Sequence, residues 1–258
     1  MNARPQKFYR YRHLQGKHRE WTKQILINSK LYFSSPLSFN DPFDCKVLFQ
    51  YSLSFKELKK KFNTLLKKKS PGLNRKQRKA IINKRVAKVE AKEFINYMTK
   101  NLQNEVNKVG ILSLSGVNDN ILLWSHYAFG HTGLCIGFIA TDISPFFRLA
   151  QKVHYNQNYP NIDILNNSPV EMVEAFLLTK AQDWSYEAEW RIIDHDEGHG
   201  LKQFPEKLMT EIIFGACMSK EDKKEVMSWL EKRNNPVRLF QAVLEPKTYS
   251  LRIEPYMP

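Results

Sequence analysis

Short runs in which apolar and polar residues alternate recur along most of the chain. They predict β-strands, because successive side chains of a strand point to opposite faces. Strands are expected over residues 8–13, 31–33, 111–115, 134–138, 152–155, 186–194, 210–214, 237–244 and 249–253. Apolar residues three and four apart predict helices over residues 21–27, 122–128, 168–181 and 220–232. Because these elements do not form regular strand–helix–strand units, the pattern predicts an α+β fold of mixed, mainly antiparallel sheets that form a central cleft, with flanking helices.

Residues 54–109 show a different pattern, with long helical periodicity. Ser54 and Glu57 form a capping-box pair ahead of a first helix, and Pro71-Gly72 interrupts it. Asn74 and Gln77 form a second cap, and the helix that follows ends at Gly110. The sequence therefore predicts a single α+β domain over residues 1–258, with a helical hairpin inserted at residues 54–109.

Most of the formal net charge of +14 lies in this hairpin. Between Lys56 and Glu93 the chain has 15 Lys or Arg residues and three Glu residues, whereas the remainder holds 25 basic and 23 acidic residues. Lysine-rich faces bind phosphate backbones mainly through counterion release, so the hairpin is a candidate nucleic-acid-binding surface. A second interpretation is that the lysines only solvate the two helices. The candidate residues are Lys59, Lys60, Lys67, Lys68, Lys69, Arg75, Lys76, Arg78 and Lys79.

Composition excludes several classes of protein. A chain of 258 residues with 42% hydrophobic residues is long enough to build a sizeable core. No apolar run approaches the ~20 residues of a membrane span, and the N-terminal segment lacks the apolar region of a secretory signal. A cytoplasmic protein without membrane contact is therefore expected. Cys45, Cys135 and Cys217 are too widely spaced for a disulfide framework or a zinc site, so no metal is expected. The oligomeric state is left open.

The segment YEAEWRII carries the sharpest candidate chemistry. In a strand, Glu187, Glu189 and Arg191 share one face, which is too much charge for a dry core. One interpretation is a solvent-facing ladder in which Arg191 pairs with the glutamates. The other is a pocket floor in which one glutamate binds a substrate hydroxyl and stabilises a developing cation, with one carboxyl pKa raised by the other.

Two arginines alternate with tyrosines in the segment FYRYR near the N-terminus. Arg10 and Arg12 suit a phosphate group through their bidentate guanidinium groups, although structural ion pairs explain them equally well. His126 and His131 are five residues apart, which fits neither a helical nor a strand pair of metal ligands. They are expected to form hydrogen bonds at turns, and Tyr127 fits the core better than a stacking platform.

The segment SSPLSFNDPFDC, residues 34–45, combines two prolines, an Asn-Asp pair and aromatic residues. Asn and Asp form turns by bonding their own backbone, and aromatic residues beside them can wall an apolar slot for a flat ring. The segment is either such a pocket wall or a tight corner of the core.

These motifs, in this order, resemble a known bacterial family. FYRYR, LYFSSPLSFNDPFDC, LSLSGVNDNILLWSHYAFGHTGLCIGF, and Lys180 with WSYEAEWRII are similar to the uncharacterised domain of unknown function 2971. The resemblance covers nearly the whole chain outside residues 56–93. It implies a family but no activity.

A more distant likeness is to ADP-ribosyltransferases that use an arginine on a first strand, a serine motif on a second and a Glu-x-Glu motif on a later strand. By that likeness, Arg12 or Arg10 would hold the pyrophosphate of NAD, Ser34 or Ser35 would support the nicotinamide ribose, Glu189 would bond the ribose hydroxyl and Glu187 would orient the acceptor. The serine motif, SSP, departs from the Ser-Thr-Ser pattern. The candidate cofactor-binding residues are Arg12, Arg10, Ser34, Ser35, Asn40, Asp41, Phe43, His126 and Tyr127.

Two functions follow from these observations. The first is an NAD-dependent ADP-ribosyltransferase-like enzyme acting on nucleic acid or protein, as a toxin or antiphage effector, with Glu189 and Glu187 as catalytic residues. The second is a non-catalytic nucleic-acid-binding protein that uses the basic helical hairpin.

Overall fold

The computed structural model describes residues 5–46, 48–49, 56, 59–60, 63–64, 66–67, 70–86, 100–101, 103–141, 145–162 and 167–257. The chain divides into two compact units. Unit 1 comprises Met1–Asp44, Lys108–Gln157 and Lys180–Pro258, and unit 2 comprises Cys45–Asn107 and Asn158–Thr179. Most of the segment predicted as a helical hairpin belongs to unit 2, together with residues 158–179, which that prediction did not include.

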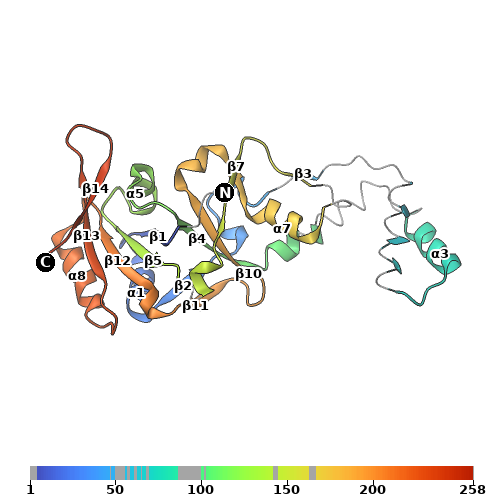
Figure 1. Ribbon diagram of the computed structural model, residues 1–258, viewed down its shortest axis with the longest axis horizontal. Coiled ribbons are helices and arrows are strands. Elements are labelled where there is room, and N and C mark those ends of the chain that lie inside the picture. Colours follow the sequence, from blue (N-terminus) through green and yellow to red (C-terminus); the bar gives the residue numbers. More distant parts are fainter. Residues whose placement is uncertain are drawn as a thin grey trace. The chain divides into compact units, whose positions relative to one another are not determined.

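An eight-stranded sheet is the framework of unit 1 (Figure 1). Its order is β14 (Leu251–Pro255), β13 (Arg238–Leu244), β12 (Met209–Phe214), β5 (Leu134–Ile139), β1 (Lys7–Arg12), β4 (Gly110–Ser115), β10 (Glu189–Asp194) and β6 (Gln151–Lys152). Neighbouring strands are antiparallel except β12 and β13, which are parallel. The predicted mixed, mainly antiparallel α+β fold is confirmed.

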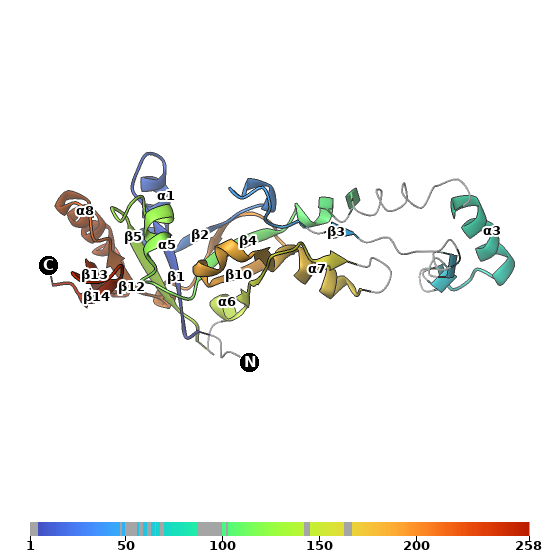
Figure 2. The ribbon, with the colours of Figure 1, turned by 90° about the horizontal axis from the view of Figure 1, so that it is seen from above.

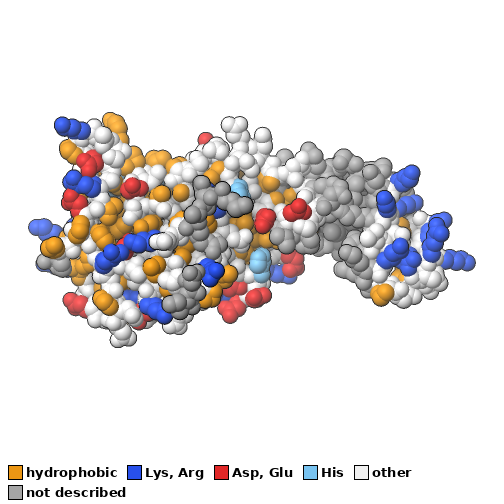
Figure 3. All heavy atoms as spheres, in the orientation of Figure 1, with side chains coloured by type: hydrophobic (Ala, Val, Ile, Leu, Met, Phe, Trp, Pro, Cys, Tyr) orange, Lys and Arg blue, Asp and Glu red, His pale blue; other side chains and the backbone are white. Residues whose placement is uncertain are grey.

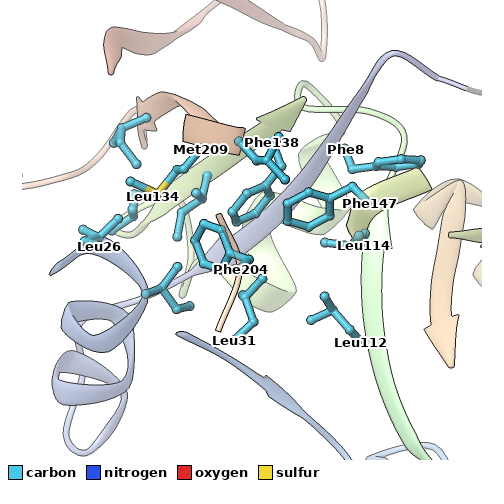
Figure 4. Packing of buried hydrophobic residues seen from close by; sticks show 14 of the residues in the cluster. Phe8, Leu26, Leu31, Leu112, Leu114, Leu134, Phe138, Phe147, Phe204 and Met209 are labelled. Atoms are coloured by element: carbon cyan, nitrogen blue, oxygen red, sulfur yellow. The ribbon is translucent and has the colours of Figure 1, made fainter. Parts of the chain in front are cut away.

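Helices cover both faces of this sheet. Residues of α1 (His18–Asn28) and α8 (Lys220–Leu230), and Phe147 of α6 (Pro145–Arg148), join a first core cluster. Leu134, Ile136 and Phe138 of β5 belong to this cluster, whereas Cys135 packs with α5 (Ile121–Tyr127) in a second cluster on the opposite face. The alternation along β5 therefore divides its side chains between two cores, as a central strand requires. Figure 4 shows the first cluster, in which Phe138 and Phe147 stack with ring centroids 4.6 Å apart.

The sheet is open between β1 and β4. These strands pair at one register position, Tyr9 with Ser115, although β1 pairs with β5 at six positions and β4 pairs with β10 at six. The other end of the same β4 edge is bridged by Ser34, which exchanges two 2.8 Å backbone hydrogen bonds with Ile111. Ser34 follows β2 (Lys30–Phe33), which pairs with β11 (Gly200–Gln203). Strand β1 and Ser34 thus pair with opposite ends of the same edge of β4. Between these two points, the backbone groups of β4 have no neighbouring strand on this edge among the described residues and can be contacted by side chains.

The described part of unit 2 contains α3 (Arg75–Val86), α7 (Pro169–Leu177), and the short parallel strands β3 (Leu48–Phe49) and β8 (Asn161–Ile162) (Figure 2). The predicted cap of the second hairpin helix is present: Asn74 and Gln77 exchange side-chain to backbone hydrogen bonds of 2.9 Å. Ser168 and Glu171 form a complete capping box at α7. Only scattered residues of the first hairpin helix are described, and Lys68 and Lys69 lie outside the described residues.

Three boundaries differ from the sequence prediction near the site. The strand expected over residues 186–194 begins at Glu189, because Gln182–Glu187 forms a 3₁₀ helix and Ala188 has a positive φ of 44°. Glu187 therefore does not belong to the strand. The helix expected to reach residue 181 ends at Leu177 and is followed by β9 (Thr179–Ala181). The strand expected over residues 152–155 is divided into β6 and β7 (His154–Asn156). Among the described residues, no helix is both long and apolar enough to cross a membrane.

Candidate functional site

Unit 1 contains a pocket of about 400 Å³ at the opening between β1 and β4. Its volume falls within the ~300–1,000 Å³ of small-molecule sites. Its lining includes Arg10 and Arg12 of β1 together with Glu187 and Glu189. The predicted arginine and carboxylate groups therefore line one pocket, although β4 lies between β1 and β10, the strand that begins at Glu189.

Arg10 bridges the open edge of β4. Its Nη1 donates a 2.5 Å hydrogen bond to the backbone carbonyl of Ser113, which lies between the two β4 residues paired with Tyr9 and Ser34. The side chain thus satisfies an acceptor that a neighbouring strand would otherwise bond. Burial and, to a smaller extent, the nearby charge of Arg12 together lower the pKa of Arg10 to about 9. Burial also lowers the pKa of Arg12 to about 10, but both groups remain cationic at neutral pH.

The acidic wall of the pocket is a buried cluster of charged groups made by Asp44, Lys180, Glu187, Glu189 and Arg191. Lys180 Nζ lies 2.5 Å from Glu187 Oε2 and 3.1 Å from Glu189 Oε2. Arg191, which has no exposed side-chain surface, donates to both oxygens of Glu189 at 2.8 and 3.0 Å and to both oxygens of Asp44 at 3.0 and 2.6 Å. Such bidentate pairs fix geometry as well as charge. Arg191 therefore pairs with Glu189 as one interpretation predicted, but in the interior rather than in a solvent-facing ladder.

The two glutamates have different proton affinities. Burial alone would raise the pKa of Glu189, but Arg191 and Lys180 lower it to about 2. Burial raises the pKa of Glu187, and the nearby charge of Glu189 adds to this although Lys180 opposes it. Glu187 Oε1 also accepts a 2.6 Å hydrogen bond from the hydroxyl of Tyr127. Of the two glutamates, Glu187 is therefore the one that takes up a proton more readily.

The loop after β2 contributes a different set of residues from the predicted one. Ser34 and Asn40 line the pocket, together with Phe39 and Asp44 of the segment interpreted as a possible pocket wall. Ser35, Asp41 and Phe43, which were predicted to line it, do not.

Local turn chemistry explains these three corrections. Ser35 is the N-cap of the 3₁₀ turn Pro36–Ser38, where its Oγ accepts from the backbone N–H of Leu37. Asp41 Oδ1 accepts from the N–H of Phe43 at 2.8 Å, and Phe43 is 63% exposed. Phe39 instead presents its ring at the pocket, with the guanidinium carbon of Arg191 5.2 Å from the ring centroid.

Helix α5 closes a third side of the pocket. Its side chains His126, Tyr127 and Leu123 line the cavity, so the first two lie at the predicted site. Asn120 is the N-cap of this helix, because its Oδ1 accepts from the N–H groups of Leu122 and Leu123.

Residues 123–192 match the family model described as a protein of unknown function (DUF2971). This DUF2971 segment includes α5 from Leu123 onward and every charged residue of the acidic wall except Asp44. It does not include β1 with its two arginines or residues 34–45. No curated protein and no solved structure matches the chain. The likeness of these outer segments to the DUF2971 family, and the distant likeness to ADP-ribosyltransferases, therefore rest on sequence motifs alone.

Basic side chains gather on unit 2 around α3 (Figure 3). Arg75, Lys76 and Lys79 are exposed, and α3 contains no acidic residue. Arg78 is half-buried and donates to Asn63 Oδ1 at 3.2 Å and to the carbonyl of Leu73, so its guanidinium has a structural role. Lys60 and Lys67 are exposed, whereas Lys59 is half-buried. Within the described ranges, no group of three or more His, Cys, Asp or Glu residues is placed to hold a metal.

Proposed function

We propose that unit 1 is an NAD-consuming enzyme that transfers ADP-ribose to an acceptor. The observation that carries this proposal is that Arg10 and Arg12 share a pocket of about 400 Å³ with Glu187 and Glu189. A pocket that is lined by both guanidinium and carboxylate groups suits a ligand that has phosphates at one end and develops positive charge at the other.

The carboxylates take different parts in the reaction. Glu189 is ionised and held by Arg191 and Lys180, so it supplies a fixed negative charge beside the ribose. Its oxygens already accept these bonds, and a carboxylate has about four acceptor positions, so little capacity remains for a substrate hydroxyl. We therefore assign Glu189 to electrostatic stabilisation of the oxocarbenium-like transition state rather than to direct bonding.

Glu187 is the proton acceptor in this mechanism. The C–N bond between ribose and nicotinamide breaks with its electron pair moving to the nicotinamide nitrogen, which leaves as a neutral ring. The acceptor nucleophile forms the new bond to the ribose carbon, and its proton passes to Glu187. A carboxyl with a raised pKa suits this step near neutral pH. The ring of Phe39 offers a face for the nicotinamide.

Glu187→Gln tests the proposal better than substitution of Glu189, which anchors the buried cluster. A glutamine at position 187 can accept from Lys180 and donate to Tyr127, so folding is preserved while proton acceptance is lost. We expect this variant to bind NAD, measured by isothermal titration, but to lose nicotinamide release by at least ~10²-fold. Arg12→Gln should lose NAD binding, and the exposed Arg252→Gln should behave as wild type. Absence of NAD binding by the wild-type protein would overturn the proposal.

A second candidate function belongs to unit 2, where three exposed cations lie on a helix without acidic residues. We propose that this surface binds a nucleic-acid backbone. Replacing Arg75, Lys76 and Lys79 by Gln should weaken binding of a duplex oligonucleotide and reduce the salt slope by about 0.9 for each lost phosphate contact. The matched control replaces the exposed Lys220, Lys224 and Lys232 of unit 1 by Gln. Equal salt slopes for the two triple variants would contradict this function.

A further inference from the structure

Two histidines line the same pocket beside Arg12. His13 directly follows β1, and His18 is the first residue of α1. Their ring centroids lie 4.0 Å apart. The ring centroid of Phe129 lies 5.6 Å from that of His13, and the ring centroid of Trp21 lies 4.8 Å from that of His18. Each imidazole therefore packs against two other rings. These ring contacts restrict the rotation of the imidazoles and involve no hydrogen bond of their nitrogen atoms.

Polar atoms in this group are buried and lack partners. Arg12 Nε and His18 Nδ1 have no hydrogen-bond partner among the described residues. Native proteins rarely leave buried polar atoms unsatisfied, and such atoms are often explained by a ligand or ion. His13 Nδ1 accepts from the N–H of Gln15 at 3.3 Å, which places the proton of the neutral ring on Nε2, where it can be donated.

The charges around the histidines are positive. His13 faces His18 and Arg12, whereas His18 faces Arg12 and Lys17, and these cations, after burial itself, lower both histidine pKa values. Lys17 is the N-cap of α1 but makes no side-chain cap bond, so the positive end of this 11-residue helix adds to the field. Within the part of the chain that the structure describes, the charged groups that shift the two histidine pKa values are therefore all basic.

We propose that Arg12, His13 and His18 form an oxyanion subsite that binds a phosphate group of the substrate. The inference rests on the pocket assigned above but not on NAD as its ligand. Arg12 supplies the permanent charge, and the histidines supply donors whose charge depends on pH. Because a bound anion favours the imidazolium form, binding takes up protons and weakens as pH rises past the histidine pKa values.

Sulfate is a suitable probe because its charge of −2 stays constant between about pH 6 and pH 8, the range in which histidines titrate. We expect sulfate to bind the wild-type protein more tightly at the lower pH, with an affinity that rises by up to about tenfold per pH unit for each proton that the histidines take up on binding. Arg12→Gln should abolish binding. His18→Gln should weaken binding and flatten its pH dependence, whereas the exposed His154→Gln should match wild type. Circular dichroism checks folding, and Arg12→Lys, which keeps the charge but lacks Nε, should bind with intermediate affinity.

Competition separates this inference from the proposed function. Pyrophosphate that binds in a manner dependent on Arg12 and His18, together with no binding of NAD, would support the subsite and refute the NAD enzyme. NAD binding that sulfate and pyrophosphate do not displace would refute the subsite alone. Equal sulfate affinity of wild type and Arg12→Gln, or affinity independent of pH, would also overturn it.

Discussion

The buried guanidinium of Arg191 offers the most direct test of how the acidic wall is held together. We consider Arg191→Met, which keeps a long side chain but removes the charge and every donor. Arg191 donates two hydrogen bonds to Glu189 and two to Asp44, and its side chain has no exposed surface. After the substitution Lys180, 3.1 Å from Glu189 and 3.8 Å from Asp44, must offset both carboxylates as well as Glu187.

The expected loss of stability follows from two independent estimates. Breaking a buried ion pair by removing one partner costs about 3–5 kcal/mol. Glu189 gives a similar figure, because lowering its pKa from 4.5 to about 2 corresponds to about 3 kcal/mol, to which Arg191 is the largest favourable contributor. We therefore expect Arg191→Met to lower the free energy of unfolding by about 3–5 kcal/mol at pH 7.

Urea unfolding followed by tryptophan fluorescence measures this difference. The matched control is Arg252→Met, because Arg252 also pairs with two carboxylates, Glu245 and Glu254, but its side chain is 57% exposed. Exposed pairs are worth about 0–1 kcal/mol, so the control should be nearly neutral. A loss below ~1 kcal/mol for Arg191→Met, equal to the control, would refute the electrostatic account of the cluster.

The pH dependence gives the same test a second readout. A lowered folded-state pKa means that Glu189 contributes stability above its unfolded pKa and loses it as pH falls toward the folded value. The gap between wild type and Arg191→Met should therefore be full at pH 7 and shrink between the ordinary pKa of 4.5 and about 2. A gap that stays constant through this interval would assign the loss to packing rather than to charge.

Three further predictions concern neighbouring features. Tyr127→Phe removes a hydrogen-bond donor that favours ionised Glu187, so the pKa of Glu187 should rise further. The acidic limb of the pH–rate profile of nicotinamide release should then move to higher pH, and an unchanged profile would contradict this. Gly133→Ala should destabilise unit 1 by about 2–4 kcal/mol in urea, because an added Cβ would lie 2.1 Å from the carbonyl oxygen of Arg12, whereas Gly72→Ala, with open space around it, should not. Ser168→Ala should cost about 1 kcal/mol of helix stability, seen as faster amide exchange in the first turn of α7, and unaltered exchange would exclude a role for the cap.

Local patterns were sufficient to predict most elements of unit 1. Strand β5 was expected over residues 134–138 and spans Leu134–Ile139, because its alternating side chains serve two cores. Helix α8 begins at Lys220 as expected, since Ser219 accepts from the N–H of Asp222. In both cases the signal lies within a few residues of the element that it specifies.

The strand register at the site was not predictable in this way. Alternation of Tyr186, Glu187, Ala188 and Glu189 looks like a continuous strand, but Ala188 adopts a left-handed conformation that glycine or asparagine would normally mark. The turn still directs both glutamates toward Lys180. The predicted pairing of the carboxylates in one site therefore agrees with the structure, although the strand geometry used to predict it was wrong.

Partners that are distant in sequence had no local signal. Arg191 and Asp44 are 147 residues apart, so nothing near either residue indicated their contact. A charged strand residue is normally expected at the surface. Arg191 is buried with its charge offset by Glu189, two residues earlier on the same strand, and by Asp44 from a distant part of the chain. Lys180 was singled out only through the family resemblance, because the expected helix placed it on no particular face.

The two arginines of β1 differ in what they can reveal about the pocket. Arg10 supplies the hydrogen bond that the open edge of β4 would otherwise lack at Ser113, so its loss would disturb the sheet as well as the pocket charge. Arg12 makes no comparable bond through Nε, and its neighbours are two histidines rather than a strand edge. A loss of ligand binding in Arg10 variants can therefore arise from a shift of β1 against β4. The same loss in a folded Arg12 variant would instead show that the Arg12 side chain contacts the ligand directly.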